Sequence, residues 1–225
     1  MISSIGKLSH VRGIIFDLDG TLTKPIMDFK KLRSDLGITT PGVDILEVIK
    51  TWSHEKQVEG HKIIYDFERE ASLRLEFQPG ASALMDTLER LNIKKAIHSR
   101  NSIENIEYFQ ERFGYTFSPI VGREIEPKPS PAGSHHIAKH WQMQPSEILF
   151  VGDSQDDMRC SRAFGSLSIL LLNSSNKHYT ELSDIAIESL SELSEALEQS
   201  FKNKQISNST STENSNLSNS NISVN

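Results

Sequence analysis

A chain of 225 residues, 36% hydrophobic and 24% charged, can bury a full core and an attached subdomain, which excludes a fibrous protein. No stretch approaches the ~20 consecutive apolar residues of a membrane-spanning helix, and the N-terminus lacks the apolar centre of a secretory signal. The formal net charge is −6 and no run of basic residues occurs, so we expect neither nucleic acid nor a membrane as a partner. The single cysteine, Cys160, cannot form an internal disulfide, which fits a reducing compartment. We therefore expect the protein in the cytoplasm, with the nucleus as a further location.

Six apolar runs of strand length recur along the chain, and segments with helical periodicity separate them. The runs lie at residues 11–17, 94–99, 118–122, 147–153, 166–172 and 184–188. Helix start signals stand between several of them: Pro79-Gly80, Ser130-Pro131, and a capping box of Ser189 with Glu192. This alternation is typical of a doubly wound, Rossmann-like parallel sheet with helices on both faces, so the sequence predicts an α/β fold.

One interval, residues 23–78, interrupts the alternation. It shows no strand signal and only helical periodicity, so we expect a small α-helical cap inserted after the first strand. The core would then consist of residues 1–22 and 79–202. From residue 203 to 225 serine, asparagine and threonine dominate, and such a segment buries too little apolar surface to offset the entropy of ordering. We therefore expect a disordered tail there.

Polar residues gather at the ends of the predicted strands, which is where parallel sheets bind their ligands. The candidate residues are, in chain order, Asp17, Asp19 and Thr21 after the first strand, Ser99, Arg100 and Asn101 after the second, Lys128 before the fourth, and Asp153 after it, followed by Asp156 and Asp157. Because the carboxyl ends of parallel strands meet at one edge of a sheet, we expect these side chains to share one site.

Asp17 and Asp19 stand one residue apart, so in an extended chain their side chains address one point in space and repel each other. A cation would relieve this repulsion. Together with Asp153 they offer hard oxygen ligands with no histidine or cysteine nearby. Such a set selects Mg²⁺, which is typically shared with a substrate phosphate.

These motifs together resemble those of the haloacid dehalogenase (HAD)-like hydrolase superfamily, in its phosphatase branch. Its four motifs occur here in the usual order: DxDxT from Asp17 to Thr21, the strand-ending Ser99, the lysine Lys128, and GDxxxD from Gly152 to Asp157. The resemblance covers residues 11 to 200. A helical insertion directly after the first motif matches the family members that carry a small helical cap there.

The resemblance implies a Mg²⁺-dependent phosphoric monoester hydrolase that acts on a small phosphorylated metabolite. Asp17 would be the nucleophile and become an aspartyl phosphate, and Asp19 would be the general acid and base. The carboxylates of Asp17 and Asp153 and the backbone carbonyl of Asp19 would hold the metal, and Asp157, with Asp156 as the alternative, would orient water on it. The phosphoryl group would be bound by Thr21, Ser99, Arg100, Asn101 and Lys128.

Other functions stay open beside this interpretation. A phosphomutase of the same superfamily shares every catalytic residue and returns the phosphoryl group to a second sugar hydroxyl instead of water. A dehalogenase is disfavoured because Asp19 is present, and a phosphonate-cleaving enzyme would need a buried cap lysine, for which Lys56 and Lys62 give no signal. A non-catalytic alternative is a phospho-aspartate signalling or scaffold protein. A signalling domain of this kind is disfavoured because it would be about half this length and its acidic pair would precede the phosphorylated strand. A scaffold protein is disfavoured because the set of catalytic aspartates is intact.

Overall fold

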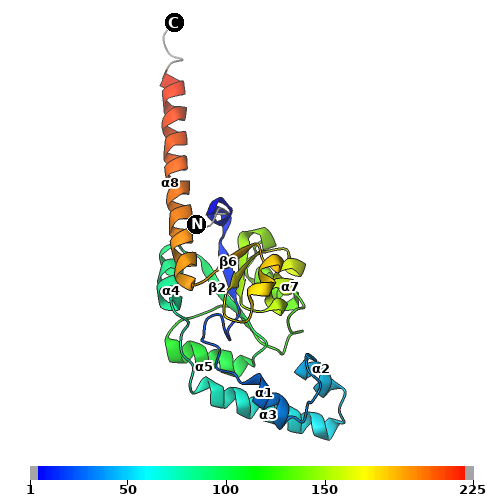
Figure 1. Ribbon diagram of the computed structural model, residues 1–225. Helices are drawn as coiled ribbons and strands as arrows, with labels where there is room; N and C mark the ends of the chain where they lie inside the picture. The colour runs from blue at the N-terminus through cyan, green and yellow to red at the C-terminus, as the bar shows by residue number, and fades with distance from the viewer. Residues whose placement is uncertain (1–4, 221–225) are drawn as a thin grey trace.

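The computed structural model describes residues 5–220 of the chain and, among them, the side chains of residues 8–206. Its centre is a six-stranded parallel sheet with the strand order β3-β2-β1-β4-β5-β6 (Figure 1). The strands are β1 (Gly13–Phe16), β2 (Lys94–His98), β3 (Ile120–Val121), β4 (Ile148–Gly152), β5 (Leu167–Leu171) and β6 (Ile185–Ile187). Each lies within one of the six apolar runs, so the predicted sheet is confirmed.

Helices cover both faces of the sheet, as the doubly wound fold requires. Ile14 and Phe16 of β1 point into one hydrophobic core, whereas Ile15 between them points into the other. The first core is closed by η1 (Ile5–His10), α4 (Ala81–Arg90), α5 (Ile103–Phe113) and α8 (Leu190–Ser220), and the second by α6 (Ala132–Trp141) and α7 (Gln155–Phe164). The short helices η2 (Pro145–Glu147) and η3 (Lys177–Leu182) lie in connections.

Three further helices lie between β1 and α4: α1 (Phe29–Asp35), α2 (Ile45–Lys50) and α3 (His54–Ser72). Each begins after a polar residue whose side chain accepts backbone N–H bonds, namely Asp28, Asp44 and Ser53. They share a small core of their own, formed by Leu32, Leu36, Ile49 and Ile64. Figure 1 shows them together beyond one edge of the sheet, and we use the name cap for residues 23–78.

The end of the chain differs from the sequence-based expectation. α8 continues to Ser220, so residues 203–220 are helical where the sequence predicts disorder (Figure 1). Its first turns pack on α4 and η1, which supplies a ready nucleus, and residues 203–220 contain neither proline nor glycine to stop its propagation. The rest of the predicted tail, residues 221–225, lies outside the described residues. None of the described helices has the length and apolar character needed to cross a membrane.

Candidate active site

The loop after β1 brings its aspartates against the end of β4. The N–H of Asp17 donates to Val151 O at 2.9 Å, which keeps Asp17 aligned with the sheet edge. Gly20 then turns the chain with φ +88°, and a Cβ at this position would lie 2.5 Å from Oδ2 of Asp153. The left-handed conformation and the close approach both require glycine here. Gly20, the residue between Asp19 and Thr21, therefore allows the loop of the first motif to contact Asp153 of the fourth.

Three carboxylates form an acidic cluster at this edge. Oxygens of Asp17, Asp153 and Asp157 all lie within 4.8 Å of one another. Asp157 is oriented by Ser154, whose N–H and hydroxyl donate to its Oδ2 at 2.9 and 2.6 Å. A Cβ on Gly152 would lie 2.4 Å from the Cβ of Asp157, so only glycine lets α7 start this close to β4. Hard oxygen donors gathered in this way fit a divalent cation such as Mg²⁺.

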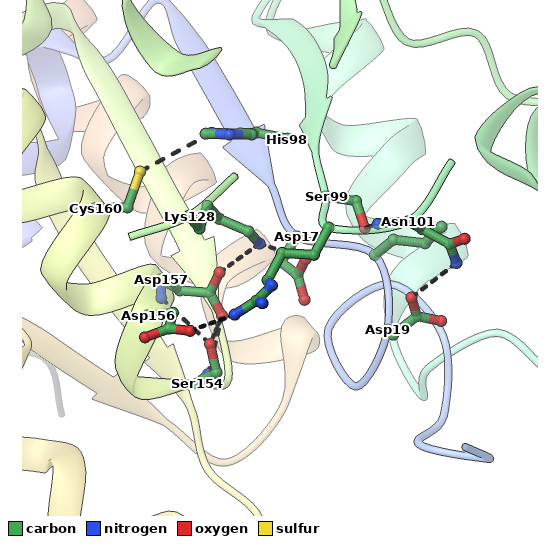
Figure 2. Close-up of polar contacts among 12 residues, drawn as sticks. Asp17, Asp19, His98, Ser99, Asn101, Lys128, Ser154, Asp156, Asp157 and Cys160 are labelled. Carbon is green, nitrogen blue, oxygen red and sulfur yellow. Dashed lines mark hydrogen bonds and ion pairs between the residues drawn. The ribbon is translucent and has the colours of Figure 1, made fainter. Parts of the chain in front are cut away.

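The ammonium of Lys128 lies between two of these carboxylates (Figure 2). Its Nζ is 2.5 Å from Oδ1 of Asp17 and 2.5 Å from Oδ1 of Asp157, and the residue is 3% exposed. Burial by itself would lower the pKa of Lys128, but the charges of Asp157 and Asp17 outweigh it and raise the pKa above its usual value. Lys128 is therefore a fixed positive charge at the site.

Asp17 and Asp153 do not readily carry a negative charge at the same time. Burial is the main cause that raises the pKa of Asp17 to about 7 and that of Asp153 to about 8, and repulsion between the carboxylates adds to it. Lys128 opposes both shifts without cancelling them. One ammonium does not balance three carboxylates, and a bound divalent cation would supply the charge needed.

Asp19 lies apart from the acidic cluster in Figure 2. Its Oδ2 accepts a hydrogen bond of 3.1 Å from the side-chain amide of Asn101. Burial raises the pKa of Asp19 to about 6, against the opposing effect of this hydrogen bond. A carboxyl group with such a pKa can exchange protons near neutral pH, which sets Asp19 apart from Asp17 in environment as well as in position.

The residues after β2 divide into two groups. Ser99 is 2% exposed, and its hydroxyl accepts a 3.1 Å bond from the N–H of Asn101. Arg100 points elsewhere: it donates to Asp156 at 2.8 Å and to Asp44, the N-cap of α2 in the cap. Arg100 therefore links core and cap. Asp156 is occupied by this ion pair, so Asp157 is the acidic residue of α7 that belongs to the cluster.

A cavity of about 670 Å³ lies between the cap and the sheet edge, and most of the expected residues line it. Those that do are Asp17, Asp19, Ser99, Arg100, Asn101, Lys128, Asp153 and Asp156. Asp157 lies behind them and is fully buried. Thr21 is also buried and does not line the cavity, and within the part of the chain that the structure describes its hydroxyl has no hydrogen-bond partner.

Sequence reasoning missed several residues of the site. Asn173 donates to Oδ2 of Asp153 at 3.1 Å, and its position just beyond β5, at the same sheet edge, is a signal that could have revealed it. Glu68 and Arg33 line the cavity from the cap, and Arg123 lines it from the core. Glu68 and Arg33 lie on helices whose sequences resemble ordinary charged surface, so nothing in the sequence distinguishes them.

Fold and site together define a class of protein: an α/β domain with a doubly wound parallel sheet and an acidic cluster at the carboxyl edge of that sheet. A family model described as haloacid dehalogenase-like hydrolase matches residues 11–165. The chain belongs to this family and is an enzyme, a hydrolase. A haloacid dehalogenase-like hydrolase domain-containing protein of Arabidopsis thaliana is 36% identical over 211 residues, covering 86% of each chain. The motifs had predicted this membership.

Other similar proteins agree with this assignment. An uncharacterized hydrolase of Saccharomyces cerevisiae is 37% identical over 202 residues, which cover 85% of this chain and 93% of the yeast protein. A phosphoglycolate phosphatase of Pasteurella multocida is 24% identical and covers 70% of this chain and 84% of its own. The chain thus has phosphatase relatives within the hydrolase family.

Solved structures share the fold at low sequence identity. A hydrolase from Pseudomonas syringae has a TM-score of 0.72 at 21% identity, covering 84% of this chain and 98% of its own. A β-phosphoglucomutase from Clostridium difficile has a TM-score of 0.70 at 18% identity, covering 87% and 99%. At this level of identity, these two structures show that the chain shares their fold.

Proposed function

We propose that this chain is a Mg²⁺-dependent phosphoric monoester hydrolase that acts on a small phosphorylated metabolite through an aspartyl-phosphate intermediate. The observation that carries the proposal is the position of Asp17. Its carboxylate lines the cavity at the end of the central strand, 2.5 Å from the Lys128 ammonium and beside the carboxylates of Asp153 and Asp157. Relatives named phosphoglycolate phosphatase support the same reaction class.

The reaction divides into two displacements at phosphorus. A carboxylate oxygen of Asp17 forms a bond to phosphorus while the ester P–O bond breaks, and Asp19 gives its proton to the departing oxygen, which leaves as an alcohol. Water then attacks the phosphorus of the aspartyl phosphate and passes a proton to the Asp19 carboxylate. Inorganic phosphate leaves, and both aspartates return to their starting states.

The side chains of Asp17 and Asp153 would hold the metal, with the backbone carbonyl of Asp19 as a further ligand, and Asp157 would orient water on it. A bound Mg²⁺ would offset the negative charge that gathers between nucleophile and phosphate.

Lys128 and the hydroxyl of Ser99 are the donors available to the phosphoryl oxygens, and the amide of Asn101 holds Asp19. We do not assign phosphate binding to Arg100, which Asp44 and Asp156 engage, or to Thr21, which lies outside the cavity lining.

The remaining charges of the cavity favour a substrate with a second anionic group. Arg123 is neutralised by Glu68, whereas Arg33 and Arg159 line the cavity without an ion pair among the described residues. The guanidinium of Arg33 donates to the backbone carbonyls of Thr40 and Val43, which orient it without cancelling its charge. A carboxylate or second phosphate on the leaving group would meet this charge.

The test is a panel of phosphate esters incubated with the purified chain and Mg²⁺, with release of inorganic phosphate as the readout. We expect turnover that stops with excess chelator and returns with added Mg²⁺. Full turnover in chelator, or none on any ester, would contradict the proposal. Product analysis tests the phosphomutase alternative, because a mutase would convert a sugar phosphate into its isomer without releasing phosphate.

A further inference from the structure

A chain of buried hydrogen bonds runs from the cap to Asp19. Glu68, on α3 of the cap, accepts from Arg123 at one carboxylate oxygen and from Nδ2 of Asn105 at the other, the latter at 3.2 Å. Nδ2 of Asn105 also donates to Oδ1 of Asn101 at 2.9 Å. Asn101 in turn donates to Asp19 at 3.1 Å (Figure 2). Glu68, Asn105 and Asn101 are each 7–8% exposed, so water does not compete freely for these groups.

Glu68 fixes the direction of the first donor in this chain, the amide of Asn105, and the backbone of Ser102 acts with Asn105 on the second, the amide of Asn101. A carboxylate only accepts hydrogen bonds, so the amide of Asn105 must turn its NH₂ group toward Glu68. That NH₂ group also faces Asn101, which therefore presents its oxygen, and the backbone N–H of Ser102 supports this orientation with a 2.9 Å bond to the same oxygen. The NH₂ group of Asn101 is left to face Asp19.

Glu68 is the cap's contribution to this chain, whereas Asn105, Asn101 and Asp19 belong to the core. We propose that Glu68 is a positioning residue: with the cap docked it holds Asp19, through Asn105 and Asn101, in the orientation in which Asp19 transfers protons. Release of the cap removes the carboxylate, and the amide of Asn105 is then free to turn. The proton-transfer step thereby depends on a closed cap. This inference rests on the proposed function, in which Asp19 is the general acid and base.

Glu68 could instead have a purely structural role, in which it does not act on Asp19. The pair of Glu68 with Arg123 could serve only to attach the cap, and a buried ion pair is by itself weak evidence for more. The two roles separate at Asn105. Asn105→Ala breaks the chain to Asp19 but leaves the Glu68–Arg123 pair in place, whereas Glu68→Gln disturbs both. An attachment role predicts little effect of the first substitution, and a positioning role predicts similar effects of the two.

The test measures the first turnover by rapid quench, as the rate at which Asp17 is phosphorylated, with Mg²⁺ present. An alkyl phosphate needs a proton on its leaving oxygen, whereas p-nitrophenyl phosphate does not. We expect Glu68→Gln and Asn105→Ala to slow phosphorylation by the alkyl ester by about 10- to 100-fold, the scale of a misplaced acid, and to leave the nitrophenyl ester within about threefold. Glu70→Gln, exposed on the same helix and paired with Arg74, is the matched control and should change neither rate.

A second comparison uses the Asp19→Asn background. If Glu68 acts through Asp19, adding Glu68→Gln there changes the ratio of the two rates no further. Equal slowing of both esters, or a full additional effect in the Asp19→Asn background, overturns the inference while leaving the hydrolase intact. A wild-type chain that phosphorylates Asp17 with neither ester contradicts the proposed function itself. Melting temperatures of all variants identify any that fail to fold.

Discussion

Nζ of Lys128 lies 2.5 Å from Oδ1 of Asp17, and both side chains are almost completely buried, with exposed fractions of 2% and 11%. A charged pair held out of water in this way survives only because each partner balances the other. Lys128 also bonds to Asp157, so it remains paired when Asp17 loses its charge. The proposed nucleophile can therefore be neutralised without leaving an unpaired buried ammonium.

Asp17→Asn uses this property. The amide has a similar volume to the carboxyl group, so the chain should fold, but an amide oxygen is a poor nucleophile toward phosphorus. We expect phosphate release with Mg²⁺ to fall by about 10³-fold or more, on the scale of nucleophile knockouts, while the melting temperature changes by only a few degrees. Asp66→Asn, on an exposed cap aspartate paired with Lys62, serves as the control. A variant that keeps a tenth of the activity shows that another residue is the nucleophile.

Asp19→Asn should separate the two halves of the reaction. The substitution keeps the backbone carbonyl and roughly the side-chain volume but removes the acid and base. A nitrophenyl ester needs no proton to leave, so Asp17 should still be phosphorylated, whereas hydrolysis of the intermediate should slow by ~10²–10⁴-fold. Intact-protein mass spectrometry should then detect an added phosphoryl group, and the Asp17→Asn, Asp19→Asn double variant should not gain it. Loss of Mg²⁺ binding without any gain in mass would instead make the Asp19 side chain a metal ligand.

The sequence predicted the core of the site because the topology of a parallel sheet places strand ends together. Asp17, Ser99 and Asp153 each follow an apolar run, and that rule alone brings them to one edge. Asn173 follows the same rule and could have been found with it. The sequence could not show which of Asp156 and Asp157 belongs to the acidic cluster. That depends on which side of the first turn of α7 faces Lys128 and which faces Arg100.

The contribution of the cap could not be predicted from the sequence. Glu68 and Glu70 are neighbours on one amphipathic helix, and only the packing of α3 on α5 makes the first buried and the second exposed. The end of α8 differs from the sequence-based expectation for another reason. Composition indicates what a segment can bury, but residues 203–220 extend a helix that the preceding turns have already nucleated on the core.

Arg33 gives a prediction about substrate choice. 3-Phosphoglycerate and glycerol 3-phosphate differ only by a carboxylate in place of a hydroxymethyl group. If Arg33 meets a second anionic group, the wild-type chain should have the higher kcat/KM for 3-phosphoglycerate, and Arg33→Gln should lower that value by about 10- to 100-fold, the worth of one hydrogen bond to a charged group. Turnover of glycerol 3-phosphate should change by less than about threefold. Arg74→Gln, on an exposed cap arginine outside the cavity lining, is the control. Equal losses on both esters would contradict this role.

His98 gives a prediction about stability and pH. It ends β2, is fully buried, and its Nδ1 lies 3.1 Å from the hydroxyl of Ser134, while no partner of Nε2 is found in the described part of the chain. Burial, with a smaller effect of the Lys128 charge, lowers the pKa of His98 to about 3. Unfolding returns it to about 6.5, so between these two pH values the unfolded chain binds more protons than the folded chain. The free energy of unfolding therefore falls as the pH falls through this window, by about 2 kcal/mol from this residue at pH 5.

The measurement compares urea unfolding of the wild-type chain and His98→Asn at pH 7.5 and pH 5. Asparagine can keep the bond to Ser134 but does not titrate, so the variant should lose less stability on acidification than the wild-type chain does. Carboxyl groups with raised pKa values, such as Asp17 and Asp153, act in the opposite direction, but both proteins contain them and the difference between the two slopes isolates His98. His136→Asn, on an exposed histidine of α6, should keep the wild-type slope. If His98→Asn and the wild-type chain lose the same free energy between the two pH values, His98 is not a buried neutral group.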